Sequence, residues 1–283
     1  MISAEEGVRL IKSESERLSS HFETLPPDAW ERPSSCEGWT VADVVAHLVW
    51  LAEDYYGIAV VRGLRGDESY PEGLSRAGRA ESAATDETMA LLAVARRQSL
   101  GDQLLPAFQE AFRQFTDRLT GIGPQDWEKP IHHPNGVRTV ESYVPGMIQE
   151  LVLHEWDIRS SLEPSPSLSG NGLPYIMERV PQRSTPWKFP FATRSTSVGR
   201  TYYRFELTGA HPGKWDVVVE DNKARMEVAG ETAAGLSLSG DTSTFVLLMY
   251  GRLNLASAIA AGSMTAEGNQ ELVPDFDRWL TGG

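Results

Sequence analysis

Apolar residues recur every three to four positions along the N-terminal part of the chain, which is the spacing of amphipathic helices. The pattern predicts four helices, at 4–24, 40–56, 85–121 and 139–162. Thr40 stands three residues before Asp43, which resembles a capping box and marks the start of the second helix. Gly101 and Pro106 are expected to kink or split the third helix, and Pro145 is expected to bend the fourth.

Two loops in this helical part resemble each other. Residues 25–33 (LPPDAWERP) and 122–130 (IGPQDWEKP) share a tryptophan followed by an acid, a base and a proline, and each loop precedes a Thr-Val helix start. Two similar helix-loop-helix units would pack as an up-down four-helix bundle. Chance similarity between two tryptophan-containing loops is the alternative interpretation.

The pattern changes at a linker rich in proline and serine, which begins after residue 163. Runs rich in β-branched and aromatic residues then predict strands at 202–207, 215–219, 224–228, 236–238 and 264–267. Helical patterns are expected at 172–184, 242–250, 254–261 and 270–280. The sequence therefore predicts an α+β two-domain protein, with a four-helix bundle over 1–163 and a small α+β domain over 170–283.

The composition limits the kinds of partner. The chain has 283 residues, of which 41% are hydrophobic and 23% charged, as in globular proteins. Its formal net charge of -13 argues against nucleic acid as a main partner, because binding to phosphates requires a basic surface. Cys36 is the one cysteine, which excludes an intramolecular disulfide and favours a cytoplasmic location. We expect no signal peptide, because the N-terminus has neither a basic region nor an apolar one. We expect no membrane partner, because no apolar run approaches the length of a membrane span.

Three residues on two predicted helices have side chains of the types that serve as metal ligands. Glu150 and His154 are four residues apart and share one helix face, in an otherwise apolar stretch. A buried carboxylate is costly unless it is paired or bound to a metal. If His47 comes close, the three residues make a two-histidine, one-carboxylate site with open positions for chemistry. A hydrogen bond between Glu150 and His154, with His47 as an ordinary core residue, is the alternative.

Other polar residues near these positions are weaker candidates. Asp157, three residues after His154, is placed to orient a histidine or else to pair with a nearby cation. Cys36 precedes a helix start, where the helix dipole favours a thiolate, but no histidine is adjacent in sequence, so catalysis by Cys36 is not expected. His132 and His133 belong to a loop containing Pro and Asn, where histidines are usually unliganded.

Two runs carry a family resemblance. The run 36–48 (CEGWTVADVVAHL) resembles the signature of the mycothiol-dependent maleylpyruvate isomerase family, and the run 150–157 (ELVLHEWD) resembles that family's second motif. These proteins have a DinB-like helical bundle, and the order of the predicted helices agrees with it. The resemblance implies metal ligands at His47, Glu150 and His154, and this sequence shows no departure from the family's triad.

The C-terminal part also resembles a known domain. The segments 238–241 (LSGD), 251–253 (GRL) and 261–268 (AGSMTAEG) look like the signature of a small sterol-carrier-like domain, which many members of the isomerase family carry. The resemblance therefore covers most of the chain. It implies a DinB-like up-down four-helix bundle followed by an α+β sterol-carrier-like domain.

The resemblance also implies a chemistry. Three protein ligands leave zinc, the expected metal, with an open position, and a thiol that enters this position is deprotonated. The implied thiol is mycothiol, and its metal-bound thiolate would attack a small electrophilic substrate, as in an S-transferase or a maleylpyruvate-isomerase-like enzyme. Arg252 is the candidate catalytic residue that binds an anionic group of the substrate, or else it forms a salt bridge within its own domain.

Two alternative functions remain open at this point. Two histidines and one carboxylate also hold iron for oxygen chemistry. The alternative from another class is a non-catalytic small-molecule-binding module, since the C-terminal domain resembles carriers of apolar ligands. An intact triad argues against that alternative, because a scaffold has no need to bury Glu150 without a partner.

Overall fold

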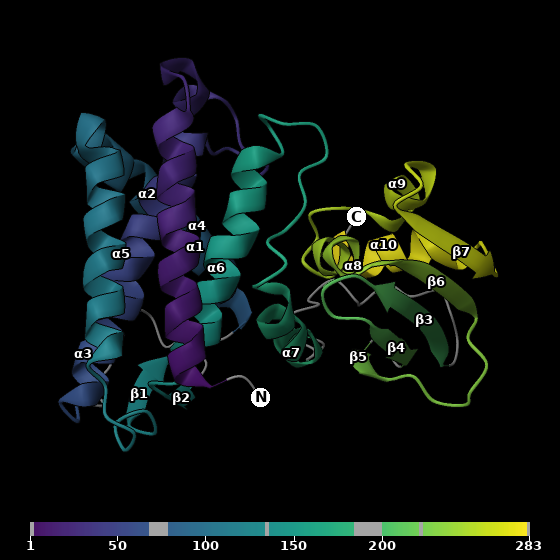
Figure 1. Cartoon of the computed structure of the whole chain (residues 1–283). Coiled ribbons are helices and arrows are strands. Elements are labelled where there is room, and N and C mark those ends of the chain that lie inside the picture. Colours follow the sequence, from purple (N-terminus) through teal and green to yellow (C-terminus); the bar gives the residue numbers. More distant parts are fainter. Residues whose placement is uncertain (1–2, 68–78, 134–135, 184–199, 221–222, 282–283) are drawn as a thin grey trace. The chain divides into compact units, whose positions relative to one another are not determined.

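The structure, a computed structural model, describes residues 3–67, 79–133, 136–183, 200–220 and 223–281 (Figure 1). The chain divides into two compact units, Met1–Pro166 and Ser167–Gly283, and each has its own hydrophobic core. The first unit is a helical bundle, and the second combines a sheet with helices. The fold class predicted from the sequence is therefore confirmed.

Helices make up most of the first unit. They are α1 (Ala4–Thr24), α2 (Val41–Trp50), α3 (Tyr56–Leu64), α4 (Arg79–Leu100), α5 (Leu104–Thr120) and α6 (Tyr143–Arg159), with short helices η1 (Pro27–Glu31), η2 (Leu51–Tyr55) and η3 (Gly101–Gln103) between them. α1 packs beside α5 and α6, and α2 packs beside α4 and α5 (Figure 1). The predicted third helix is split at Gly101, where the backbone has a φ of +49°, as expected for glycine.

Capping residues explain where two of the bundle helices begin. Thr40 precedes α2, and its Oγ1 accepts the backbone N–H of Asp43 at 3.2 Å. In return, Asp43 Oδ2 accepts the backbone N–H of Thr40 at 2.9 Å, so the predicted capping box is confirmed. Ser3 and Glu6 form a second capping box at α1. Such a cap contributes about 1 kcal/mol to stability.

The helix that begins after Thr40 is longer than the sequence predicted. It passes without a loop through the π-helical turn η2 and continues to Leu64. Gly57 permits this turn, because a Cβ at that position would lie 2.3 Å from the Ala52 carbonyl oxygen. Contrary to the sequence-based expectation, Val41–Leu64 is long and apolar enough to cross a membrane. However, 67% of its most apolar window is buried inside the protein, which is typical of a core helix.

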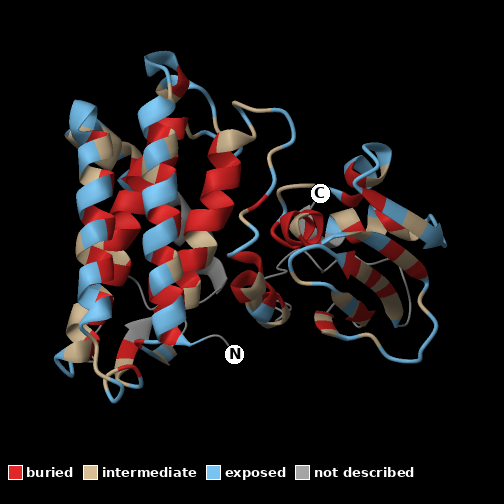
Figure 2. Cartoon of the chain, in the orientation of Figure 1, coloured by how far each residue is buried: buried red, intermediate tan, exposed pale blue. Residues whose placement is uncertain are grey.

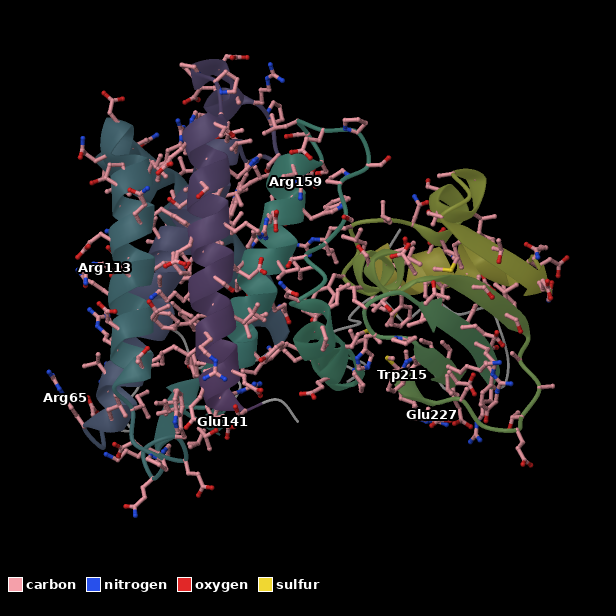
Figure 3. All side chains as sticks on the ribbon, viewed as in Figure 1. Arg65, Arg113, Glu141, Arg159, Trp215 and Glu227 are labelled. Atoms are coloured by element: carbon pink, nitrogen blue, oxygen red, sulfur yellow. The ribbon has the colours of Figure 1, made fainter. Side chains whose placement is uncertain are left out.

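Aromatic residues fill the core between α1 and α5. Phe22, Phe108, Phe112 and Phe115 are each at most 2% exposed, and the rings of Phe22 and Phe108 meet edge-on with centroids 5.2 Å apart. In Figure 2 most of α6 is buried, whereas α1 and α5 each present an exposed face. Charged side chains such as Arg113 project from these exposed faces (Figure 3).

A short hairpin precedes α6. In it, β1 (Pro130–His133) pairs with β2 (Gly136–Thr139) in antiparallel register. The sequence predicted a loop here and a helix from residue 139, but the helix begins at Tyr143, so the predicted start was wrong. Strands of four residues are too short to leave a clear alternation of apolar and polar positions.

The second unit is built on a five-stranded sheet with the order β5-β4-β3-β6-β7 (Figure 1). The strands are β3 (Thr201–Thr208), β4 (Gly213–Glu220), β5 (Lys223–Val228), β6 (Leu236–Asp241) and β7 (Met264–Gly268). Neighbours are antiparallel except β3 and β6, which are parallel. Its helices are α7 (Leu173–Arg183), α8 (Thr242–Met249), α9 (Leu255–Ala260) and α10 (Leu272–Thr281). Each of the five strands predicted for this part is present.

One buried ion pair holds a loop onto this sheet. The Arg204 guanidinium donates to both carboxylate oxygens of Asp216, each at 2.9 Å, and Asp216 is 1% exposed. Arg204 also donates to the carbonyl oxygens of Gly230 and Thr232. Burial alone would raise the pKa of Asp216, but Arg204 and the backbone N–H of Gly230 hold that pKa below its usual value.

Candidate metal centre

α2 and α6 bring the three predicted metal-binding residues together. His47 lies on α2, and Glu150 and His154 lie four residues apart on α6. Glu150 Oε2 is 3.2 Å from His154 Nε2 and 3.9 Å from His47 Nε2, and the donor atoms all lie within 4.8 Å of one another. The side chains of His47, His154 and Glu150 are 6%, 11% and 22% exposed, so the cluster is largely shielded from water.

The three donor atoms have the spacing that a divalent metal requires. Zinc binds nitrogen and oxygen at about 2.0–2.2 Å, so two ligand atoms of a tetrahedral site lie about 3.3–3.6 Å apart. The observed Nε2···Oε2 separations of 3.2 and 3.9 Å lie on either side of that range. Two imidazoles and one carboxylate are also a donor set that divalent transition metals accept. The residues present therefore fit a metal ion that keeps positions open for other ligands.

The protonation of the cluster is set by burial and by the neighbouring charges. Burial raises the pKa of Glu150, but the two neighbouring histidines more than offset this effect and hold that pKa well below its usual range. Burial lowers the pKa of His154, but Asp157, Cys36 and Glu150 together raise it well above its usual value. The pKa of His47 is lowered, mainly by burial. In the metal-free protein, His154 therefore carries a positive charge beside the Glu150 carboxylate.

Asp157 and Cys36 lie behind His154. Asp157 is 1% exposed, and its Oδ2 lies 2.9 Å from His154 Nδ1. The Cys36 thiol donates to the same carboxylate oxygen at 3.3 Å, and its sulfur lies 3.8 Å from His154 Nδ1. Of the two roles predicted for Asp157, the contact with a histidine is present in the structure.

Tryptophan rings enclose His47. Its ring centroid lies 5.2 Å from that of Trp39 and 6.0 Å from that of Trp50. His47 Nδ1 is buried and has no hydrogen-bond partner within the part of the chain that the structure describes. This side of the cluster is therefore apolar, and an apolar environment strengthens the interaction between charges.

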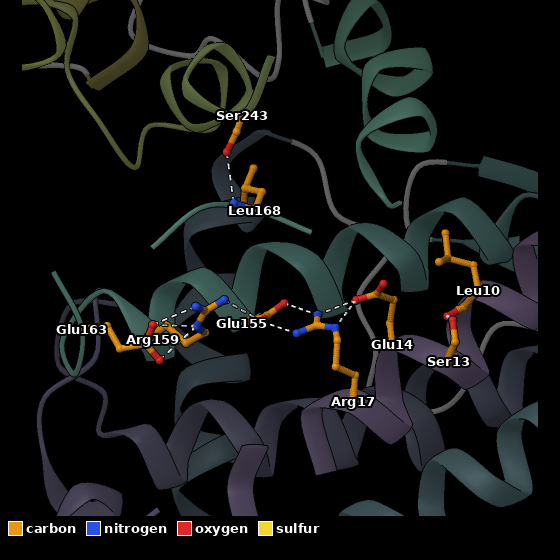
Figure 4. Close-up of polar contacts among 9 residues, drawn as sticks. All are labelled: Leu10, Ser13, Glu14, Arg17, Glu155, Arg159, Glu163, Leu168 and Ser243. Atoms are coloured by element: carbon orange, nitrogen blue, oxygen red, sulfur yellow. Dashed lines mark hydrogen bonds and ion pairs between the residues drawn. The ribbon is translucent and has the colours of Figure 1, made fainter. Parts of the chain in front are cut away.

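The residue after His154 ties α6 to α1. Glu155 is buried, and its carboxylate lies between the guanidinium groups of Arg17 and Arg159 (Figure 4). The same network includes two further carboxylates, Glu14 and Glu163. Because a buried carboxylate is stable only while it is paired, this network stabilises the packing of α6 on α1.

The remaining predicted residues are not part of this cluster. Arg252 belongs to the second unit, whereas the triad belongs to the first. It is half-buried, and its guanidinium donates to the Tyr250 carbonyl oxygen at 3.1 Å. The substrate-binding role of Arg252 stays a prediction. His132 and His133 lie on β1, and their side chains are outside the part that the structure describes.

Sequence reasoning missed the contact between Cys36 and Asp157. These residues are 121 positions apart, and a single sequence does not show which loop meets which helix. One signal was present: each residue belongs to one of the two runs, 36–48 and 150–157, that also contain the triad.

Two family models match the chain. The mycothiol maleylpyruvate isomerase N-terminal domain matches residues 11–159, and the SCP-2 sterol transfer family matches residues 192–281. The first match covers more than half of the chain and includes His47, Glu150 and His154. By sequence, no curated protein matches the chain.

Solved structures show a similar fold. A crystal structure of mycothiol-dependent maleylpyruvate isomerase is 14% identical, with a TM-score of 0.59, over 94% of this chain and 93% of that chain. A crystal structure of a mutant of mycothiol-dependent maleylpyruvate isomerase is 13% identical, with the same TM-score and coverage. At this level of identity, the likeness concerns the fold of the chain.

Proposed function

Since the chain belongs to the mycothiol maleylpyruvate isomerase family, we propose that it is a metal-dependent enzyme in which a low-molecular-weight thiol, mycothiol first, reacts with a small electrophile. One observation carries this proposal. Glu150 Oε2 lies within 3.9 Å of the Nε2 atoms of both His47 and His154, which belong to two different helices. A bundle that served only as a scaffold would gain nothing from a carboxylate between two shielded histidines.

His47, Glu150 and His154 would hold the metal. Zinc is the first choice, because it accepts this donor set and keeps an open position beside three protein ligands. When bound there, zinc supplies the positive charge that deprotonates an incoming thiol, so that a thiolate is available at neutral pH. Burial lowers the pKa of His47, which favours the neutral imidazole that a metal requires as a ligand. Glu150 contributes the one negative charge of the ligand set, which leaves a net positive charge to favour an anionic ligand.

The substrate would be an electrophile with an anionic group. In an isomerisation, the thiolate sulfur adds to an electrophilic carbon and leaves again after rotation about the weakened bond. In a transfer, the sulfur would stay bonded to that carbon, and the neighbouring atom that receives the displaced electron pair would take up a proton from solvent. The match to the isomerase family favours the first outcome. Arg252 is proposed to bind a carboxylate of the substrate through its guanidinium group, which suits two-point contact with carboxylates.

The proposed location is the cytoplasm. Low-molecular-weight thiols are kept reduced there, and a chain whose one cysteine is Cys36 has no need of an oxidising compartment.

Metal analysis of protein purified without a chelator tests this proposal. We expect about one zinc ion per chain, and we expect its loss from both His47→Ala and His154→Ala. A full metal complement in both variants would show that the ligand set is wrong. Iron in place of zinc, with an activity that requires oxygen, would favour a two-histidine, one-carboxylate oxygenase. Capture of maleylpyruvate without thiol-dependent turnover would favour a binding module.

A further inference from the structure

The two histidines of the triad differ in what lies behind them. His154 Nδ1 is 2.9 Å from Asp157 Oδ2, whereas His47 Nδ1 is buried and unpartnered within the described residues. The ring of His154 is thus fixed from its far side by a charged acceptor. With Nδ1 engaged by Asp157, Nε2, which faces Glu150, is the ring nitrogen left to bind a metal.

The carboxylate that faces His154 is itself held in place. Asp157 lies one turn further along α6 and is 1% exposed, so its side chain has little freedom. The Cys36 thiol donates to Asp157 Oδ2 at 3.3 Å, and the Ser35 backbone N–H donates to the Asp157 carbonyl oxygen at 2.9 Å. The loop before α2 is therefore hydrogen-bonded to the turn of α6 that contains Asp157. α2 carries His47, so these contacts connect the two helices of the triad.

We propose that Asp157 is the positioning residue of this centre: it accepts the Nδ1–H of His154 and directs the Nε2 lone pair to the metal, while the Cys36 thiol holds the carboxylate. This inference rests on the proposed function, because it requires a metal at the triad. It assigns no contact with substrate to either Asp157 or Cys36.

The charge of Asp157 has a consequence for the metal. A carboxylate behind an imidazole makes the ring a stronger electron donor, and loss of such a partner typically weakens metal binding about 10–100-fold. A stronger donor also leaves less positive charge on the metal. Without the carboxylate, a thiol bound to the metal would therefore lose its proton at lower pH. Both effects act through His154, so they are absent when only the stability of the fold changes.

The same three residues permit a rival arrangement. Cys36 Sγ, His154 Nδ1 and Asp157 Oδ2 lie close enough together to hold a metal of their own. However, the 2.9 Å and 3.3 Å separations are those of two hydrogen bonds to one carboxylate oxygen, and these bonds account for the burial of Asp157 without an ion. The positioning role therefore excludes Cys36 as a metal ligand, and the rival requires it.

Asp157→Asn is the main test, because it keeps the size of the side chain and removes its charge. Zinc affinity is measured by competition with a chromophoric chelator, and folding by circular dichroism of the metal-free protein. We expect the affinity to fall about 10–100-fold and the helical signal to be unchanged. The pH profile of the thiol-dependent reaction should shift toward lower pH, which a merely structural role of Asp157 would not cause.

Glu155→Gln is the matched control. Glu155 is the other buried carboxylate in this part of α6, and it is paired with Arg17 and Arg159 (Figure 4). The variant should unfold at a lower temperature, because two guanidinium groups lose their partner. Its zinc affinity should stay within about twofold of the wild type, since Glu155 does not contact His154 through a hydrogen bond or ion pair in the described part of the structure.

A measurement on the wild type removes any dependence on the folding of a variant. Long-range ¹H–¹⁵N correlation spectra of the zinc-loaded protein report which imidazole nitrogen of His154 carries the proton. We expect a proton on Nδ1 and zinc on Nε2. Zinc on Nδ1, or no proton there, would overturn the proposal.

Two other results would overturn it. One is an Asp157→Asn variant that is folded and binds zinc as tightly as the wild type. The other is a second equivalent of cobalt with a sulfur-to-metal charge-transfer band that disappears in Cys36→Ala, since Cys36 would then be a ligand. If the wild type binds no metal, or if His154→Ala binds it equally well, the proposed function fails instead. The two failures are thus distinguishable.

Discussion

The carboxylate of Glu150 lies 3.2 Å from Nε2 of His154, one helical turn further along α6. The same oxygen lies 3.9 Å from Nε2 of His47, which reaches it from α2. Glu150 is therefore the residue through which the two helices meet at the centre. Burial would raise its pKa, but the two histidines hold that pKa well below the usual range, which favours the ionised carboxylate.

Removal of this charge should weaken metal binding. In Glu150→Gln the side chain keeps its size but becomes a poor metal ligand, and a lost charge-assisted contact costs about 1.5–3 kcal/mol. We expect zinc affinity, measured by chelator competition, to fall at least about tenfold. Glu141→Gln, which alters an exposed acid just before α6, should leave the affinity unchanged. Wild-type affinity in Glu150→Gln would mean that this carboxylate is not a ligand.

The shape of the helix that carries His47 depends on one glycine. In Gly57→Ala the new Cβ would lie 2.3 Å from the Ala52 carbonyl oxygen, so the π-helical turn has to distort. We expect a loss of about 1–3 kcal/mol in the free energy of unfolding by urea. Gly121→Ala is the control, because its Cβ would meet nothing closer than 3.7 Å. Equal stability of the two variants would show that the turn tolerates a side chain.

The Arg204–Asp216 pair gives the second unit a pH-dependent stability. The folded pKa of Asp216 lies below its ordinary value of 3.8, so the carboxylate stabilises the folded state above about pH 3.8. This stabilisation is lost as the pH falls through the folded pKa. At pH 7 we expect Asp216→Asn to be less stable than the wild type by about 2 kcal/mol. The difference should shrink below about pH 3.8, and a difference that is independent of pH would contradict this account.

If Arg252 binds the substrate and not the metal, its substitution should weaken substrate binding and leave metal binding unchanged. Arg252→Lys keeps the charge but loses the planar fork that contacts a carboxylate at two points. We expect KM for the electrophile to rise about tenfold, with the zinc content unchanged. Unchanged KM and kcat would place Arg252 outside the active site. Loss of zinc along with activity would instead point to a structural role.

Local sequence patterns predicted those features of the structure that are determined by residues close together in the sequence. Thr40 and Asp43 are three residues apart, so their capping box could be read directly, and the i, i+4 spacing of Glu150 and His154 placed both on one helix face. Apolar and polar positions also predicted the strands of the second unit.

The parts that depend on tertiary contacts could not be predicted in this way. The helix that continues through Gly57 to Leu64 contains two glycines and a cluster of tyrosines, which give no clear helical signal by themselves. Burial in the bundle overrides that weak propensity. The contact of Cys36 with Asp157 joins a loop to a distant helix, so only the folded chain shows it.

X-ray absorption at the zinc edge tests the central claim most directly, namely that the triad holds a metal to which the sulfur of a low-molecular-weight thiol binds. Before thiol is added, we expect only nitrogen and oxygen ligands, at about 2.0–2.2 Å. After addition of mycothiol, one sulfur should appear at about 2.3 Å, in the wild type and also in Cys36→Ala, so that the sulfur comes from the added thiol. A coordination shell that contains no sulfur after addition, or that contains sulfur beforehand, would contradict the account.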